Sequence, residues 1–201
     1  MPLDAALRDE LLAMRDRDQR VRAELSADGS LFGGYHPRME AVHREHAIRL
    51  REIIAERGWP GRSAVGDEGA AAAFMIVQHA IGEPDFMRSA LELMRDAASR
   101  GELDPIPVAM LEDRIRDLEG RAQLYGTQFD WDDHGRMSPK PIEDESGVDA
   151  RRAAIGLPPL AEAVAAMRAR VAEAGEPPPS DGESYRRAYG EWLVKTGWRA
   201  P

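Results

Sequence analysis

The segment AAAAFMIVQHAI, residues 70–81, decides the fold. It is apolar on nearly every side of a helix, and a helix of this kind is normally covered by neighbours all round. We therefore expect a helix over residues 67–81 to lie at the centre of a bundle. Gln78 and His79 interrupt its apolar surface close to its end.

Helical periodicity continues on both sides of this centre. Residues 3–25 carry apolar side chains at spacings of three and four, which is typical of one long amphipathic helix. A second helix is predicted over residues 38–57, because Gly58 suits the position after a helix end and Pro60 prevents continuation. Pro84 suits the start of a further helix. The apolar stripes predict that six side chains are largely buried: Leu50, Ile53, Phe74, Val77, Leu111 and Ile115.

The helical pattern is then interrupted. Residues 123–131 and 136–144 flank the turn-like sequence Asp-Asp-His-Gly, which predicts a small β-hairpin or an extended arm. Pro139 and Pro141 restrict its second half to a sheet edge, because proline has no backbone N–H to donate. The predicted fold class is therefore mainly α. It is a compact multi-helix bundle around a buried central helix, with one small β-hairpin or extended arm near residues 123–144.

Helical periodicity returns in the C-terminal part of the chain. Two further helices are predicted up to Gly175, and a last one over residues 185–198. The segment EPPPSDGES, residues 176–184, has the composition of a linker. We therefore expect one helical domain over residues 1–175, followed by a Pro-rich linker and a C-terminal helical tail over residues 176–201.

The composition excludes several classes of function. The chain of 201 residues has no cysteine, which excludes disulfides, thiolate nucleophiles and cysteine-ligated zinc. Its formal net charge of −9 disfavours a nucleic-acid partner, because binding to phosphates depends on clustered Lys and Arg. A run of about 18 apolar residues is lacking, so no membrane span is expected, and the N-terminus lacks the pattern of a secretory signal. We expect a cytoplasmic protein, and the excess of Arg over Lys with abundant Ala is typical of a GC-rich bacterial genome.

His43 and His46 are the first candidate site residues. At about 100° per residue they share the inward face of their predicted helix with Leu50 and Ile53. An i, i+3 pair on one face can hold a metal, orient a carboxylate or bind a polar ligand. The sequence His-Arg-Glu-His lacks the zinc-peptidase spacings, and no third ligand stands at a recognised spacing. We therefore expect no tightly bound metal and treat both as candidate substrate-binding residues, with ordinary core histidines as the alternative.

Gln78 and His79 are the second candidates. A buried amide or imidazole without a partner costs roughly 1–3 kcal/mol, so each needs a partner, which is either structural or a ligand. A buried imidazole also suits general acid/base chemistry near neutral pH. We take His79 as a candidate catalytic residue and Gln78 as a candidate substrate-binding residue.

The segment from Asp113 to Gln128 is the third candidate. Asp113 and Arg114 flank a predicted helix, and Gln123-Leu-Tyr-Gly-Thr-Gln128 follows it. Its amide, phenol and hydroxyl groups suit a polar pocket, while a hairpin edge with ordinary hydrogen bonds is the alternative. Asp113 and Tyr125 are the candidate catalytic residues of this segment. Arg114, Gln123 and Gln128 are its candidate substrate-binding residues.

Five short motifs occur in the order GWP (58–60), QHA (78–80), DR (113–114), YGTQ (125–128) and RRAAIGL (151–157). In this combination they resemble an uncharacterised bacterial family, a domain of unknown function, over about residues 40–160. Such a family implies no activity, cofactor or catalytic residue. The resemblance implies that QHA, DR and YGTQ surround one site. We therefore predict that His79 shares a pocket with Arg114 and at least one of Tyr125 and Gln128.

Three functions are consistent with these candidates. The favoured one is a small cofactor-independent enzyme of the hydrolase, lyase or isomerase type, in which His79 is the acid or base and the substrate is small and polar or anionic. The first alternative is a non-catalytic binding protein of the immunity, antitoxin or adaptor type, whose acidic surface suits a basic partner. The second alternative is a metal-dependent enzyme using His43, His46 and one further ligand. The oligomeric state is left open by the sequence.

Overall fold

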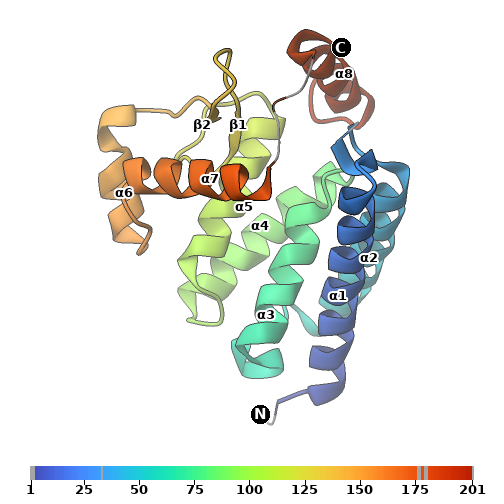
Figure 1. The fold of residues 1–201 in the computed structure, drawn as a ribbon. Helices are drawn as coiled ribbons and strands as arrows, with labels where there is room; N and C mark the ends of the chain where they lie inside the picture. Colours follow the sequence, from blue (N-terminus) through green and yellow to red (C-terminus); the bar gives the residue numbers. More distant parts are fainter. Residues whose placement is uncertain (1–2, 33, 176–177, 179–180, 201) are drawn as a thin grey trace. The chain divides into compact units, whose positions relative to one another are not determined.

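The computed structural model describes residues 3–32, 34–175, 178 and 181–200. The described residues form eight α-helices, two short 3-10 helices and one two-stranded antiparallel sheet (Figure 1). The predicted fold class, a mainly α bundle with one small hairpin, is confirmed. The chain forms two compact units, Met1–Asp104 and Pro105–Pro201.

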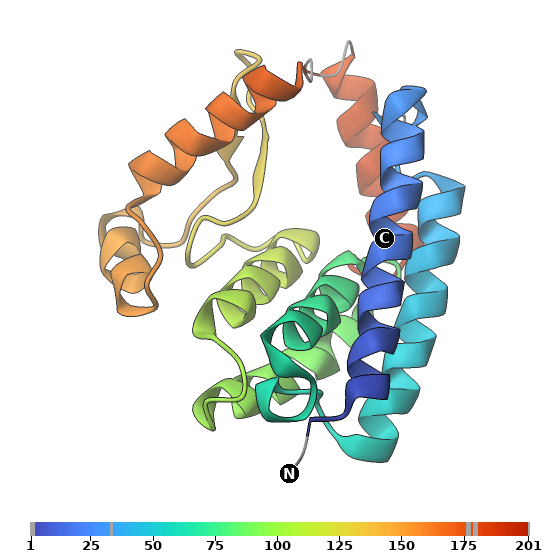
Figure 2. The same ribbon diagram turned by 60° about the horizontal axis from the view of Figure 1, so that its bottom comes forward.

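The first unit is a bundle of helices. Its elements are α1 (Ala5–Ala27), the 3-10 helix Ser30–Phe32, α2 (Pro37–Arg57), α3 (Arg62–His79) and α4 (Pro84–Ser99). Helices α1 and α2 run side by side in opposite directions, and α3 packs against both of them (Figures 1 and 2). Because α4 also contacts α3, the helix that contains the apolar segment is the centre of this bundle, as predicted.

The core of the first unit follows the predicted stripes, with one exception. Phe74 is only half-buried, whereas the sequence predicts that it is largely buried. Ala71 is exposed and Met75 is half-buried, so these three positions mark one side of α3 that is only partly covered. The other five predicted core side chains of the chain are buried: Leu50, Ile53, Val77, Leu111 and Ile115.

Gly66 divides α3 into a first turn and a regular helix. Its φ of 71° lies in the left-handed region, which glycine adopts without strain. The regular helix therefore begins after Gly66, where the sequence predicts it. It ends at His79 rather than at residue 81, because the chain must turn before α4 begins at Pro84.

The second unit combines a helix, a hairpin and three further helices. Its elements are α5 (Pro105–Leu118), β1 (Phe129–Trp131), β2 (Met137–Pro139), the 3-10 helix Glu145–Gly147, α6 (Val148–Ala154), α7 (Leu160–Ala174) and α8 (Gly182–Lys195). The two strands pair antiparallel, with Phe129 opposite Pro139 and Trp131 opposite Met137. Both strands of a two-stranded sheet are edges, which accounts for a proline in β2. Helix α7 packs against β2 and α6 (Figure 1).

The predicted C-terminal tail is described in part. Residues 176, 177, 179 and 180 of the predicted linker lie outside the described residues. Helix α8 overlaps the last predicted helix and begins three residues earlier, at Gly182 instead of Tyr185. The single domain over residues 1–175 stays a prediction. None of the described helices combines the length and the apolar character needed to cross a membrane.

Candidate functional site

Asp18 is a buried carboxylate in α1. The buried residues of this helix are Leu7, Leu11, Met14, Asp18 and Leu25. Asp18 therefore takes an apolar position in a helix that packs against α2 and α3, and only 2% of it is exposed. A carboxylate at such a position needs partners that compensate for its lost hydration.

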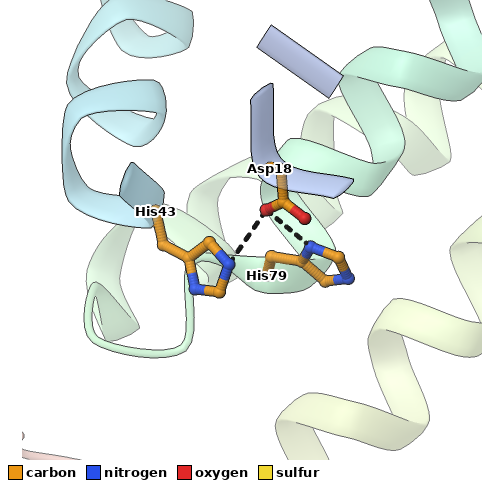
Figure 3. A group of neighbouring side chains, drawn as sticks. All are labelled: Asp18, His43 and His79. Carbon is orange, nitrogen blue, oxygen red and sulfur yellow. Dashed lines mark hydrogen bonds and ion pairs between the residues drawn. The ribbon is translucent and has the colours of Figure 1, made fainter. Parts of the chain in front are cut away.

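His79 and His43 are the partners of Asp18 (Figure 3). Nδ1 of His79 donates a hydrogen bond of 3.0 Å to Oδ2 of Asp18. Nε2 of His43 lies 2.9 Å from the same oxygen. The three side chains point toward one another from α1, α2 and the C-terminal end of α3. The structure thus brings together two histidines that belong to separate candidate sites in the sequence.

The bond to Asp18 determines which nitrogen of His79 can act as a base. A carboxylate only accepts, so the proton of a neutral His79 lies on Nδ1 and the lone pair on Nε2. Figure 3 shows Nε2 on the side of the ring that faces away from Asp18. The side chain of His79 is 28% exposed. Among the described residues, Asp18 is its one hydrogen-bond partner.

His43 is held at its other nitrogen by Tyr35. The Tyr35 hydroxyl lies 2.8 Å from Nδ1 of His43, and the two rings stack with centroids 5.7 Å apart. Burial raises the pKa of Tyr35, so the hydroxyl keeps its proton and donates to Nδ1. Burial lowers the pKa of His43, so the imidazole is neutral near pH 7. Its own proton then lies on Nε2, which is close to Asp18 but not aligned for a hydrogen bond with it.

Asp18 is ionised in this setting. Burial by itself raises the pKa of a carboxyl group, but the contacts with His43 and His79 outweigh burial and hold the pKa of Asp18 well below its usual range. The cluster is therefore one anion flanked by two imidazoles. Such an arrangement can orient a histidine for acid/base chemistry or hold a metal ion.

A small cleft opens beside His43. It is lined by Tyr35, Glu40, His43, Arg44, Ala80, Gly82 and Glu83. Its volume of about 10 Å³ has room for roughly one water molecule. The guanidinium of Arg44 lies 2.9 Å from Glu40 and 3.8 Å from Glu83, so the charges of the lining are paired. The cleft is therefore too small for a large ligand.

Gln78 and His46 are the other candidates in this unit. Both are buried, and neither hydrogen-bonds to Asp18. Oε1 of Gln78 and both ring nitrogens of His46 have no hydrogen-bond partner within the described part of the chain. Burial lowers the pKa of His46, and the Arg17 charge lowers it further. His43 and His46 both lie on the buried face of α2, as predicted. The atoms that could hold a metal, however, come from Asp18, His43 and His79.

Asp113, a candidate of the second unit, accepts hydrogen bonds from the loop that follows α5. It is fully buried in α5. Its carboxylate accepts from the backbone N–H groups of Leu124 at 2.7 Å, Tyr125 at 3.1 Å and Thr127 at 3.0 Å, and from the Thr127 hydroxyl at 3.0 Å. Because both oxygens already accept hydrogen bonds, these contacts favour a structural role for Asp113.

Gln123, Gln128 and Tyr125 belong to the same network. The buried side-chain amide of Gln123 donates to the carbonyls of Gln128 at 3.0 Å and Lys140 at 2.9 Å. Its oxygen accepts from the backbone N–H of Gln128 at 2.6 Å. The carbonyl of Tyr125 accepts from the buried guanidinium of Arg152 at 2.5 Å. These candidates are therefore brought together, mainly through contacts that shape the loop.

The predicted pocket would combine His79 with Arg114 and at least one of Tyr125 and Gln128, which belong to different units. His79 lies in Met1–Asp104, whereas the other three lie in Pro105–Pro201. The shared pocket stays a prediction.

Asp18 and Tyr35 are not among the site residues predicted from the sequence. Asp18 gives a detectable signal, because it follows Leu11 by seven residues and Met14 by four and therefore falls on the inward stripe, where an unpaired acid is unusual. Tyr35 gives no comparable signal. It lies in a Gly-rich segment, and its bond to His43 depends on tertiary structure.

The sequence was also compared with known proteins. A family model described as "Family of unknown function (DUF6624)" matches residues 5–171. The match includes α1, and thus Asp18, and it ends before α8. Neither a curated protein nor a solved structure matches the chain.

Proposed function

This chain belongs to DUF6624, a family of unknown function, and from the geometry of its own side chains we propose that it is an acid/base enzyme with His79 as its general base. The observation that carries this proposal is the 3.0 Å hydrogen bond between Nδ1 of His79 and Oδ2 of Asp18. It gives the histidine a fixed tautomer and a fixed ring orientation.

Asp18 is the positioning residue in this mechanism. It is ionised, it lies on the buried face of α1, and it keeps the proton of His79 on Nδ1. The lone pair on Nε2 is then available to remove a proton from a substrate or from a water molecule. The negative charge of Asp18 also stabilises the imidazolium that forms when Nε2 takes up this proton.

The proposed substrate is small and polar or anionic. His79 is only partly exposed, and the cleft next to its cluster partner His43 is small, which supports a small substrate. Proton removal by one base is the first step of many hydrolysis, elimination and isomerisation reactions. We place the enzyme in the cytoplasm and assign it no cofactor.

The test is turnover by the full chain and by three variants. The substrates are small chromogenic esters, phosphoesters, amides and glycosides. His79→Ala is expected to abolish turnover, and Asp18→Asn to lower kcat by about 10²–10⁴-fold, because the base loses its fixed tautomer. His134→Ala, at an exposed position of the hairpin turn, is the matched control and retains activity.

Stability separates a catalytic His79 from a structural one. If the histidine is catalytic, His79→Ala leaves the melting temperature within a few degrees. If it is structural, the loss of a partner for buried Asp18 costs about 1–3 kcal/mol. A folded His79→Ala protein with full turnover would refute the proposed role.

A non-catalytic binding protein is the second candidate, and the net charge of −9 favours it. Such a charge attracts a basic partner at low ionic strength. Salt-sensitive capture of one basic protein by both the wild type and His79→Ala, without turnover of any substrate, would support this candidate.

A further inference from the structure

The Asp18 cluster has the composition and geometry of a transition-metal site. We propose that Asp18, His43 and His79 bind one divalent ion of the zinc type. The binding itself is independent of the proposed enzymatic function, whereas its consequence for catalysis, described below, rests on that function.

The donor atoms of the three side chains lie close together. One atom from each of the three residues lies within 4.8 Å of the other two. Oδ2 of Asp18 is 2.9 Å from Nε2 of His43 and 3.0 Å from Nδ1 of His79. Zn²⁺ binds imidazole nitrogen and carboxylate oxygen at about 2.0–2.2 Å, and three protein ligands with one open position are typical of a catalytic or exchangeable site.

Two buried polar atoms of the cluster lack a well-aligned hydrogen bond. Oδ1 of Asp18 is buried and has no hydrogen-bond partner among the residues that the structure describes. Nε2 of His43 is also buried, and its 2.9 Å contact with Oδ2 of Asp18 is not aligned as a hydrogen bond. A buried polar atom without a partner is rare in a native protein, since it loses its hydration and gains nothing. A cation between these side chains coordinates the carboxylate and the imidazole, and it satisfies both residues at once.

Tyr35 has the role of an outer partner in this site. A histidine that binds a metal usually donates its other ring N–H to a nearby oxygen, which fixes the ring. With the ion on Nε2, His43 carries its proton on Nδ1 and donates it to the Tyr35 hydroxyl, 2.8 Å away. The same contact thus serves the metal-free and the metal-bound states with donor and acceptor exchanged.

Metal binding removes the base that the proposed function requires. An ion on Nδ1 of His79 displaces the proton from that nitrogen, and the neutral ring then carries its proton on Nε2. The nitrogen that faces away from Asp18 becomes a hydrogen-bond donor. The metal-bound protein is therefore expected to lack general-base activity, and chelation restores that activity.

Calorimetric titration of the chelator-treated full chain with Zn²⁺ alone tests the site. We expect one ion per chain, and at least a tenfold loss of affinity in both His79→Ala and Asp18→Asn. His134→Ala again serves as the control and binds like the wild type. Co²⁺ should give the visible absorption bands of a tetrahedral nitrogen and oxygen site in the wild type, and these bands should be absent from His79→Ala.

Two outcomes overturn the site: no saturable binding of Zn²⁺, or equal binding by the wild type, His79→Ala and Asp18→Asn. A thermal-shift assay guards against misfolded variants, because Zn²⁺ should raise the melting temperature of the wild type and not that of a cooperatively folded His79→Ala protein. The titration contains no substrate, so its result does not depend on whether the protein is an enzyme. Turnover that depends on His79 without any Zn²⁺ binding would reject the metal site alone, and Zn²⁺ binding without turnover would reject the enzyme alone.

Discussion

Asp18 acts on two histidines through a single oxygen atom. Oδ2 accepts from Nδ1 of His79 and lies 2.9 Å from Nε2 of His43. The two imidazoles differ in accessibility, because the side chain of His43 is 9% exposed and that of His79 is 28% exposed. The carboxylate therefore orients a buried ring and a solvent-accessible ring at the same time, and only the second can meet a substrate directly.

The tautomer of His79 can be predicted directly from its hydrogen bond to Asp18. In the metal-free protein, nitrogen-15 NMR of the neutral ring should show the proton on Nδ1 and a lone pair on Nε2, because Asp18 can only accept. In Asp18→Asn the side-chain amide can also donate, so we expect a mixture of both tautomers. The exposed His134 should keep the same signals in both proteins, and an Nε2–H tautomer of His79 in the wild type would contradict the proposed base.

Single candidate residues could be predicted from the sequence, but their partners could not. His43 and His79 stand out as polar residues on apolar helix faces, and periodicity alone identifies both. Their meeting at Asp18 joins residues that are 25 and 61 positions away from it, and no local pattern encodes such a contact. The acid on the inward stripe of α1 was the one available clue.

Helix α5 and the loop that follows it form a structural element around Asp113. The loop donates three backbone N–H groups and one hydroxyl to this carboxylate. Gly126, at the centre of the loop, has a φ of 67°, and a Cβ atom there would lie 2.8 Å from side-chain carbons of Ile142 and Leu160. A glycine in an extended segment permits a close approach of neighbouring groups, because it has no side chain. The structure shows that the approaching groups are apolar side chains of the same unit.

Removing the Asp113 carboxylate should unfold this loop. We expect Asp113→Ala to lower the free energy of unfolding by about 3 kcal/mol or more, because several buried N–H groups lose a charged acceptor. Urea denaturation measures the effect. Asp133→Ala is the matched control, since the Asp133 side chain is 88% exposed and its loss should change stability by less than about 0.5 kcal/mol. An equally small effect at Asp113 would show that the loop is held by other contacts.

Leu111 tests the predicted inward face of α5. Its side chain is fully buried, so Leu111→Ala should cost about 2–5 kcal/mol through lost burial and the cavity that remains. Val194→Ala, at an exposed position of α8, should cost much less. A loss below about 1 kcal/mol for Leu111→Ala would mean that the wrong face of α5 has been assigned to the core.

Most elements could be predicted because their signals are local. Gly58 and Pro84 mark a helix end and a helix start, and the turn between residues 131 and 136 marks the hairpin. The half-buried position of Phe74 could not be predicted in this way. Its helix is apolar nearly all round, so the sequence does not say which side remains partly uncovered.

For the whole molecule, the buried histidines predict a loss of stability in mild acid. Burial lowers the pKa of both His43 and His46 in the folded chain. The unfolded chain has histidine pKa values near about 6.5, so it binds more protons than the folded chain below this pH. The free energy of unfolding should therefore fall as the pH drops below about 6.5 and through the lower folded pKa values. The ionised Asp18 stabilises the folded chain, because its pKa in the folded chain lies below the usual value near 3.9. This stabilisation is lost only when the pH falls below about 3.9 and the carboxyl group takes up a proton.

Urea denaturation at pH 7.5 and pH 5.5 checks this prediction. The midpoint should be lower at pH 5.5, and His46→Gln should reduce the difference between the two conditions, since it removes one of the buried imidazoles. His134→Gln should leave the difference unchanged. An unchanged midpoint in the wild type would show that His43 and His46 titrate alike in the folded and unfolded chain.

The loop around Asp113 is shaped to hold an anion, and the chain itself supplies that anion. Four donors, the N–H groups of Leu124, Tyr125 and Thr127 and the Thr127 hydroxyl, converge on one carboxylate. In Asp113→Ala the same donors would face a space that matches a free carboxylate ion. Chemical rescue follows: formate should raise the melting temperature of Asp113→Ala in a concentration-dependent manner, because it binds the folded loop and not the unfolded chain. Chloride at equal ionic strength should not do so, and the wild type should not respond to formate, because its own side chain already fills this position.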